Sequence, residues 1–390
     1  MKFFLILFIA ISNQFLFAQN VLWEFQTDGR VYSSPIVDGE LVYFGSGDHK
    51  FYAVHKRTGV KEWEFETKGA VHSSPTIFEN HIYFGSTDGN LYALNKNDGS
   101  LVWVFQSEGE KMYDIWDYYL SDPTSHEEKI YWGSGDGNMY ALNGITGKLE
   151  WKYQTDDIIH ASPVIADSSL YFGNYNGNFY SLDIENGDLL WRFRTIGDSY
   201  FPKGEVQKAA LVEDGTVYFG SRDYNIYALD AKTGRGKWNK KTGSWVISTP
   251  FAYKGQLFFG TSDSHLFYST NKANGKINWE VPVEMRVYGS AIAHEDIIYF
   301  GSFDGKMYGI NYKTGAVAWE FQTESSKENY HRMFREEGGF KEGFVLYGEN
   351  YLKSEKLIHA LGSILSTPLI AENIIYFGSS DGKLYAINLK

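Results

Sequence analysis

The 390-residue chain contains no cysteine. It therefore cannot form a disulfide, present a thiolate nucleophile, build a cysteine-based metal site or carry a lipid on a cysteine. Basic residues are also in deficit, because 36 Lys and Arg stand against 48 Asp and Glu, a formal net charge of −12. A charge of this sign argues against nucleic acid as a partner.

Long hydrophobic runs are equally scarce. An apolar run follows Lys2 and extends to Phe17, broken by polar residues at 12–14. It is too short for a comfortable membrane span, whereas one positive charge, a short apolar core and the small residue Ala18 are typical of a secretory signal. We expect residues 1–18 to be a cleaved signal peptide, and the protein to be periplasmic or secreted, with no transmembrane segment and no lipid anchor.

What the chain has in abundance is a repeat. A Tyr or Phe followed by an aromatic-Gly step occurs eight times, seven of these steps precede a tryptophan by 18 or 19 residues, and the unperturbed period is 40. The glycines are Gly45, Gly85, Gly133, Gly173, Gly220, Gly260, Gly301 and Gly378. The tryptophans are Trp23, Trp63, Trp103, Trp151, Trp191, Trp238, Trp279 and Trp319. A period of this size indicates an array of identical supersecondary units.

Each unit reads as four short strands. In the second unit, residues 71–78, 81–86, 91–95 and 101–106 are rich in β-formers and largely alternate, with Gly, Asn and Asp between them. Ser-x-Asp-Gly lies between the second and third runs, and Thr-Gly or a close variant lies between the third and fourth. Because these polar residues recur in nearly every unit, we interpret them as turn formers.

The two ends of the array complement each other. Residues 21–27 form one outer strand without a preceding unit, and the chain stops after residues 383–388 have supplied a third strand. We therefore predict an all-β fold, an eight-bladed β-propeller of four-stranded antiparallel blades over residues 19–390, whose last blade is completed by the N-terminal strand. The recurring tryptophans are expected to fill the gaps between blades.

The repeat also resembles a known family. The pattern Asp-Gly-x-Leu-Tyr-Ala-Leu-x-x-x-Thr-Gly-x-x-x-Trp, matched closely at 88–103, 136–151 and 304–319, resembles the PQQ repeat of quinoprotein-dehydrogenase-like propellers. The resemblance covers essentially the whole mature chain. The same repeat occurs in the non-enzymatic BamB-like branch, a periplasmic protein-interaction scaffold, so the motif implies the fold and not the activity.

The two branches imply different functions. The enzymatic branch usually carries a vicinal cysteine pair over the quinone, whereas the BamB-like branch is lipid-anchored through an N-terminal cysteine, and this chain has neither. We expect an exported, non-catalytic scaffold for protein–protein interaction or envelope assembly, a monomer with a protein partner and without cofactor or metal. The alternative is a quinoprotein-type dehydrogenase, or a small-ligand sensor, that binds PQQ or another ligand at the channel mouth.

The repeats differ in length mainly between a tryptophan and the glycine of the following aromatic-Gly step, which indicates that loops in this interval have been elaborated. One insertion is expected at about 198–205 and a mostly helical one at 324–362, with helices over about 325–337 and 351–361. The insertion after Trp103 lies either in the link between blades or in the hairpin at 121–129. The predicted partner-binding residues in these insertions are Tyr200, Phe201, Tyr330, Arg332, Phe334 and Arg335.

A second group of candidates follows from the propeller geometry. One residue at the start of each innermost strand should face the channel mouth, where a polar and aromatic ring could hold a small ligand. The predicted ligand-binding residues are Tyr32, His72, His160, Gln207 and Tyr288, together with Trp245, which falls outside the repeat position. Tyr113 is the candidate in the third blade. No nucleophile-base pattern, phosphate loop or His-Glu metal motif stands out, so no catalytic or metal-binding residue is predicted.

Overall fold

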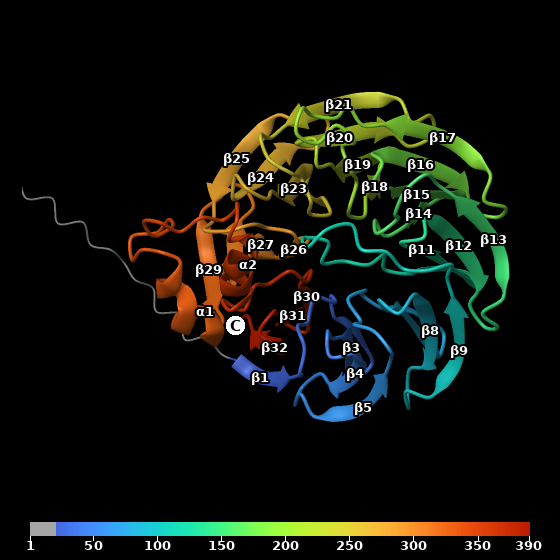
Figure 1. Ribbon diagram of the computed structural model, residues 1–390, viewed down its shortest axis with the longest axis horizontal. Helices are drawn as coiled ribbons and strands as arrows, with labels where there is room; N and C mark the ends of the chain where they lie inside the picture. Colours follow the sequence, from blue (N-terminus) through green and yellow to red (C-terminus); the bar gives the residue numbers. More distant parts are fainter. Residues whose placement is uncertain (1–20) are drawn as a thin grey trace, which may run out of the picture.

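The computed structural model describes residues 21–390, so the predicted signal peptide lies outside the described residues. Eight four-stranded antiparallel sheets are arranged around one axis (Figure 1), which confirms the predicted eight-bladed propeller. The short first strands of neighbouring blades contact one another around the axis, and the tryptophan strands lie outermost.

The strands of the first four blades run in chain order from the axis outward. Blade one comprises β2 (Ile36–Asp38), β3 (Leu41–Gly45), β4 (Lys50–His55) and β5 (Lys61–Glu66). Blade two comprises β6 (Thr76–Phe78), β7 (His81–Gly85), β8 (Asn90–Asn95) and β9 (Leu101–Gln106). Blade three comprises β10 (Thr124–His126), β11 (Lys129–Gly133), β12 (Asn138–Asn143) and β13 (Leu149–Gln154). Blade four comprises β14 (Val164–Ala166), β15 (Ser169–Gly173), β16 (Asn178–Asp183) and β17 (Leu189–Arg194).

The remaining blades follow the same order, except that the eighth takes its outer strand from the start of the chain. Blade five comprises β18 (Leu211–Glu213), β19 (Thr216–Gly220), β20 (Asn225–Asp230) and β21 (Gly236–Lys241). Blade six comprises β22 (Phe251–Tyr253), β23 (Gln256–Gly260), β24 (Leu266–Asn271) and β25 (Ile277–Pro282). Blade seven comprises β26 (Ile292–His294), β27 (Ile297–Gly301), β28 (Lys306–Asn311) and β29 (Val317–Gln322). Blade eight comprises β30 (Leu369–Ala371), β31 (Ile374–Gly378), β32 (Lys383–Asn388) and β1 (Val21–Gln26).

Strand β1 closes the ring as the sequence predicts. It pairs antiparallel with β32, placing Trp23 opposite Ala386 and Phe25 opposite Leu384. Trp23 and Phe25 also pack into the core between blades eight and one. Closure therefore removes the free edge that β32 would otherwise present to solvent.

The recurring tryptophans lie between blades. Trp63, on the outer strand of blade one, donates from Nε1 to the carbonyl of Lys96 in blade two at 3.2 Å. Its ring covers Gly99, which has φ +71°, and a Cβ at this glycine would lie 2.6 Å from the ring. The Thr-Gly-type turn thus needs glycine both for its left-handed backbone and for contact with the tryptophan of the preceding blade.

The Asp residues of the Ser-x-Asp turns act locally, as predicted. Asp48 Oδ1 accepts from the Lys50 amide at 3.1 Å, and its Oδ2 accepts from the Tyr52 hydroxyl at 2.7 Å. Asp88 binds the Tyr92 hydroxyl in the same way, also at 2.7 Å. These carboxylates hold turns and the neighbouring tyrosines, and the interpretation of the recurring Asp as turn formers is confirmed.

A ring of hydroxyl groups joins the innermost segments of neighbouring blades. The Ser34 amide donates to Ser74 Oγ at 3.0 Å, and the Thr367 amide donates to Ser34 Oγ at 2.9 Å. The Ser290 amide donates to Thr367 Oγ1 at 3.0 Å. A Ser or Thr before proline at 33–35, 73–75, 248–250 and 366–368 is the sequence signal for this ring, which the period analysis overlooked.

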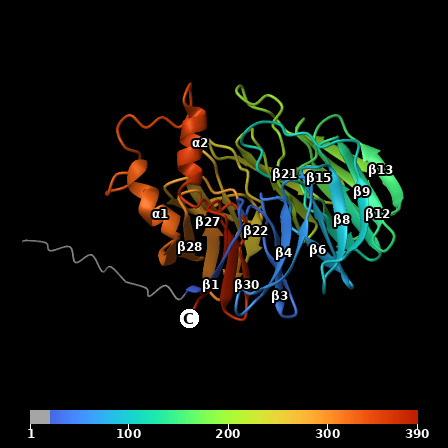
Figure 2. The ribbon, with the colours of Figure 1, turned by 60° about the horizontal axis from the view of Figure 1, so that its bottom comes forward.

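All three insertions lie in links that project from the same side of the propeller (Figure 2). They are residues 107–123, 195–210 and 323–368, and we call this side the insertion face. The alternative that put the first insertion in the hairpin at 121–129 is wrong, because the β10–β11 turn has the same length as the corresponding turns of other blades.

The longest insertion is helical near its two ends, with an irregular middle. It contains α1 (Glu324–Asn329), η1 (Tyr330–Arg332) and α2 (Tyr351–His359). The first helix is shorter than the predicted 325–337 and begins after Thr323, whose side chain accepts from the Ser326 amide. Among residues 21–390 no helix is long and apolar enough to cross a membrane.

Candidate functional site

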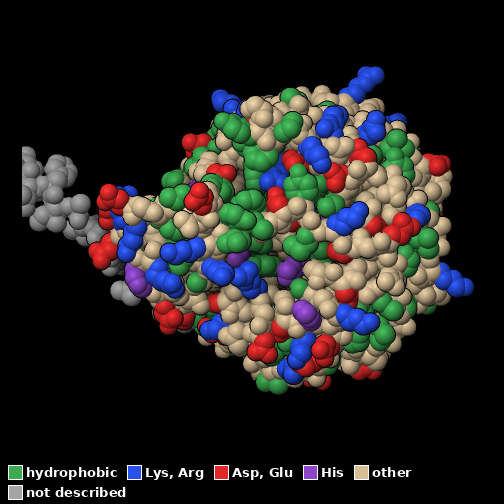
Figure 3. Space-filling view, in the orientation of Figure 1, with side chains coloured by type: hydrophobic (Ala, Val, Ile, Leu, Met, Phe, Trp, Pro, Cys, Tyr) green, Lys and Arg blue, Asp and Glu red, His purple; other side chains and the backbone are tan. Residues whose placement is uncertain are grey.

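The channel mouth on the insertion face is filled by the chain itself. Tyr118 and Tyr119 of the first insertion enter one hydrophobic cluster with Ile358 and Leu361 from the end of the third. The cluster also holds the predicted mouth residues Tyr32 and Tyr288, as well as Ile247 and Leu365. Figure 3 looks onto this face, where hydrophobic side chains gather toward the centre among interspersed acidic and basic ones.

Tyr119 lies across the channel. It belongs to the link that enters blade three, yet its hydroxyl donates to the carbonyl of Leu365 at the start of blade eight, at 3.0 Å. The ammonium of Lys208, from blade five, lies 3.4 Å from the centre of the Tyr119 ring. Burial lowers the pKa of Lys208 to about 8, although Asp122 opposes this shift. Three blades thus hold one aromatic ring on the axis.

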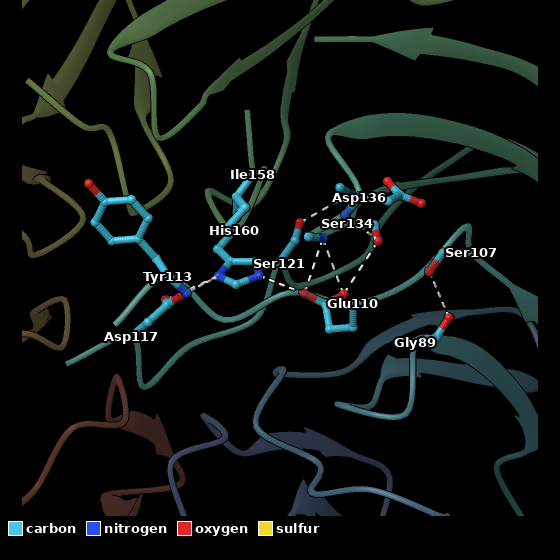
Figure 4. Close-up of polar contacts among 12 residues, drawn as sticks. Gly89, Ser107, Glu110, Tyr113, Asp117, Ser121, Ser134, Asp136, Ile158 and His160 are labelled. Atoms are coloured by element: carbon cyan, nitrogen blue, oxygen red, sulfur yellow. Dashed lines mark hydrogen bonds and ion pairs between the residues drawn. The ribbon is translucent and has the colours of Figure 1, made fainter. Parts of the chain in front are cut away.

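His160, a predicted ligand-binding residue, is held between two carboxylates (Figure 4). Its Nε2 lies 2.7 Å from Glu110 Oε1, and its Nδ1 lies 3.0 Å from Asp117. Glu110 also accepts from the Gly135 amide at 3.1 Å, and Asp117 accepts from the Tyr175 hydroxyl at 2.6 Å. Because both ring nitrogens bind carboxylates, the imidazole clamps the first insertion to blades three and four and has no nitrogen left for a ligand.

The two channel histidines have opposite protonation states. Burial, the largest effect, opposes the charge on His160, but Asp117 and Glu110 together raise its pKa to about 10. Burial lowers the pKa of His72 to about 4, and the nearby Arg30 adds to this effect. At neutral pH, His160 is therefore an imidazolium and His72 a neutral ring, which packs edge-on against Tyr32.

A second polar cluster joins the first and third insertions. Glu355 of α2 accepts from the Tyr118 hydroxyl at 2.5 Å, from Trp116 Nε1 at 3.0 Å and from Arg286 Nη1 at 3.0 Å. Arg286 is fully buried, and its Nη2 donates to the Tyr347 hydroxyl at 3.0 Å. These bonds fix α2 over the mouth.

Beside this cluster the insertions enclose a pocket of about 380 Å³, which we call the aromatic pocket. It is lined by Trp116, Tyr200, Phe201, Arg222, Tyr224, Trp245, Asp263 and Tyr347. Arg222 stacks on Trp245, with its guanidinium 3.9 Å from the ring centre, and pairs with Asp114 at 3.1 Å. The pocket combines residues from all three insertions with turns of blades five and six.

The structure places the other predicted ligand-binding residues in three different surroundings. Tyr32, His72 and Tyr288 lie at the filled mouth. Gln207 is buried, and its Oε1 has no hydrogen-bond partner among residues 21–390. Trp245 lies in the aromatic pocket instead.

The third-blade candidate needs correction. Tyr113 belongs to the link, where its hydroxyl donates to Glu205 at 2.9 Å. The residue three positions before the proline, as in the other blades, is Leu120.

The predicted partner-binding residues are also divided. Tyr200 is exposed and Phe201 packs edge-on against Trp245, both at the aromatic pocket. Phe334 is buried in the mouth cluster, with Tyr330 stacked on it at 4.6 Å, so neither offers a free aromatic face. Arg332 and Arg335 are exposed, and Arg332 lines a separate pocket of about 320 Å³ within the longest insertion.

The site residues that the sequence reasoning missed are Glu110, Asp117, Arg222, Arg286 and Glu355. One signal was available: the second residue of the turn between the second and third strands of a blade varies. It points toward the insertion face at Arg222 and Phe303 of two Ser-x-Asp turns and at Tyr175 of the corresponding Asn-Tyr-Asn turn. A variable residue inside a constant turn marks a position that the scaffold leaves free for other uses.

A quinone with a calcium ion does not fit the channel mouth. The volume near the axis is taken by Tyr118, Tyr119 and α2, all held by hydrogen bonds. Within the described chain no group of three His, Asp or Glu side chains is placed to hold a metal ion. We therefore derive no step through a quinone.

Comparisons with known proteins agree on the fold. The family model described as outer membrane protein assembly factor BamB matches residues 18–200 and 202–338. The solved structure of BamB from Moraxella catarrhalis superimposes with a TM-score of 0.72 at 15% identity, covering 95% of this chain and 99% of that one. No curated protein sequence gives a significant match.

Two dehydrogenases share the same architecture. A europium-containing methanol dehydrogenase has a TM-score of 0.70 at 13% identity, covering 95% of this chain and 93% of that one. Quinohemoprotein alcohol dehydrogenase from Comamonas testosteroni has a TM-score of 0.71 at 12% identity, covering 95% and 76%. At such identities the likeness shows the propeller fold alone.

Proposed function

The chain belongs to the family described as outer membrane protein assembly factor BamB, and from this we propose that it is an exported, non-catalytic scaffold that binds a protein partner at the cell envelope. The family assignment supports a periplasmic location, as does the signal-like segment at residues 1–18. The partner would dock on the insertion face.

The observation that carries this proposal is the exposure of apolar side chains on all three insertions. Tyr200, Met112 and Val345 are 79%, 57% and 60% exposed, one from each insertion. Ile115 of the first insertion and Leu352 of the third are exposed as well. Apolar groups exposed together on loops of a rigid scaffold are typical of protein-binding surfaces.

The filled channel mouth supports a scaffold over a dehydrogenase. A cofactor site on the axis would require Tyr119 and α2 to leave, which would break the Tyr119–Leu365 and Tyr118–Glu355 bonds. It would also expose Ile358 and Leu361, which are fully buried. Both changes oppose cofactor binding because buried hydrogen bonds and apolar contacts would be lost together.

Site-specific photo-crosslinking tests the docking surface. A photoreactive phenylalanine analogue is placed at Met112 or Val345 on the insertion face, and at Val60 on the opposite face as the control, which is 63% exposed. In cells that produce the protein naturally, we expect defined crosslinked protein bands from the first two positions and none from the third. Equal crosslinking from both faces would contradict this docking surface.

The dehydrogenase alternative has its own test. The purified protein is mixed with PQQ and calcium, and quinone absorbance and dye-linked alcohol oxidation are followed. We expect neither a bound-quinone spectrum nor turnover. Stoichiometric quinone binding with alcohol oxidation would replace the scaffold proposal with the enzymatic one.

A further inference from the structure

The aromatic pocket has two separate walls. Trp116 and Tyr347 form one wall, with ring centres 6.1 Å apart. Phe201, Tyr224 and Trp245 form the other, where Phe201 packs edge-on against both neighbours at 5.8 and 4.9 Å. Tyr200 stands at the rim and is 79% exposed. The space between the walls is open to a ring-shaped ligand.

The lining is unusual in its composition. Six aromatic side chains, one arginine and one aspartate line the pocket, and no aliphatic side chain does. A pocket for an aliphatic side chain of a partner would be expected to include Leu, Ile, Val or Met. Flat aromatic walls instead favour a ligand that presents flat, weakly polar faces.

The charges around the pocket disfavour an anionic ligand. Arg222 is already paired with Asp114, and Arg286 is paired with Glu355 and lies 3.8 Å from Asp263. A cation would meet two arginines, and an anion would meet three carboxylates. Two arginines against three carboxylates leave one negative charge in excess, so the pocket offers an anionic ligand no unpaired cation to bind.

The polar groups among the lining residues suit a ligand that both donates and accepts hydrogen bonds. Trp245 Nε1 and Arg222 Nε are buried donors without a partner among residues 21–390, and the two side chains are only 6% and 5% exposed. The Asp263 carboxylate, 39% exposed, supplies an acceptor on the other side. Small-ligand sites typically combine an apolar lining with a few placed polar groups of this kind.

We propose that the aromatic pocket binds a neutral saccharide, with one or two sugar rings packed against the wall of Trp116 and Tyr347, opposite the wall of Phe201, Tyr224 and Trp245. Pyranose rings present C–H faces to aromatic rings, and their hydroxyls both donate and accept, which matches the two unpaired N–H groups and Asp263. The volume of about 380 Å³ accommodates a small ligand. The site is off the axis, so it does not need the filled mouth to open.

The proposal also explains where the chain departs from its repeat. Each insertion contributes to the pocket: the first supplies Trp116, the second Phe201 and the third Tyr347. Arg222 occupies the variable position of a Ser-x-Asp turn. A site used for binding is expected on such elaborated loops of a rigid scaffold.

Calorimetry and saturation-transfer NMR on the full mature chain test the proposal with three neutral probes: maltohexaose, cellohexaose and chitohexaose. We expect at least one to bind, and Tyr200→Ala and Asp263→Asn each to weaken its Kd by about tenfold. Val60→Ala, also exposed but on the opposite face, is the control and should leave Kd unchanged. Circular dichroism checks that all variants keep the fold.

Two results would overturn the proposal. One is the absence of binding by all three hexasaccharides, whether or not a planar aromatic probe such as riboflavin binds. The other is binding that survives both Tyr200→Ala and Asp263→Asn, since the sugar would then lie elsewhere. Neither result bears on the crosslinking test of protein docking, so the two proposals fail independently.

Discussion

The hydroxyl of Tyr118 lies 2.5 Å from a carboxylate oxygen of Glu355, although 237 residues separate them in the chain. This contact joins the link that enters blade three to the helix that precedes blade eight. It closes the channel mouth from two sides. The mouth is therefore a product of two insertions and not of the repeated blades.

Removal of the Glu355 carboxylate should destabilise the insertion face. Glu355→Ala leaves the buried Arg286 with Asp263, at 3.8 Å, as its nearest carboxylate, and removes the acceptor of Tyr118 and Trp116. We expect a loss of about 3–5 kcal/mol in the free energy of unfolding. Urea unfolding followed by fluorescence measures it, with the exposed Glu349→Ala as control.

A double variant separates charge from packing in this cluster. Glu355→Met combined with Arg286→Met removes both charges, so it should recover part of the stability lost in Glu355→Ala. If the double variant loses as much stability as Glu355→Met and Arg286→Met lose in sum, the pair does not act through charge compensation.

The His160 clamp predicts a pH dependence. In the folded state the pKa of His160 is raised to about 10, against 6.5 for an ordinary histidine, so the folded protein binds the extra proton between these values. Its stabilising contribution is complete below pH 6.5 and is lost as pH rises toward 10. The stability gap between wild type and His160→Gln should narrow over this range by at least about 1.4 kcal/mol, the equivalent of one pKa unit.

The measurement for His160 is urea unfolding of both proteins at several pH values between 6.5 and 10. Lysines and tyrosines also titrate in this range, but they are common to both proteins and largely cancel in the difference. A gap that stays constant with pH would show that the imidazole is not held as a cation.

The tryptophan–glycine contact between blades can be tested with a matched pair of substitutions. Gly99 and Gly255 have φ +71° and +77°, but only Gly99 would place a Cβ against a ring, that of Trp63, whereas nothing lies within 4 Å at Gly255. Both alanine variants should lose about 1–2 kcal/mol from the left-handed backbone. Gly99→Ala should lose about 1–3 kcal/mol more from overpacking.

Thermal unfolding of the two glycine variants checks this expectation. Similar midpoints for Gly99→Ala and Gly255→Ala would mean that the Trp63 ring moves aside without cost, and that the glycine serves the turn alone.

Removal of one side-chain hydroxyl from the ring around the channel should lower the free energy of unfolding. Ser34→Ala takes away the acceptor of the Thr367 amide, which lies at the junction of blades eight and one. An unsatisfied buried amide costs about 1–3 kcal/mol. Hydrogen exchange at Thr367 and the urea midpoint should both change, whereas the exposed Ser168→Ala should change neither.

The loops show where sequence reasoning was insufficient. His160 was placed at the channel from its position in the repeat, but the carboxylates that bind it, Glu110 and Asp117, lie in an insertion with no counterpart in other blades. Phe334 was predicted to bind a partner, yet it is buried against the mouth. The spacing of apolar residues indicates which face of a helix or strand is apolar, but not which other segment of the chain packs against that face.

The sequence by itself determined the eight blades, their turns and the closure of the last blade by β1, because each follows from local patterns repeated every 40 residues. Only the tertiary structure decided that Tyr119 blocks the axis and that Trp116 and Trp245 face a common pocket. The physical reason is that blades are specified by short-range alternation and turn chemistry, whereas the insertion face depends on side-chain packing between loops far apart in the chain, and no period relates those loops.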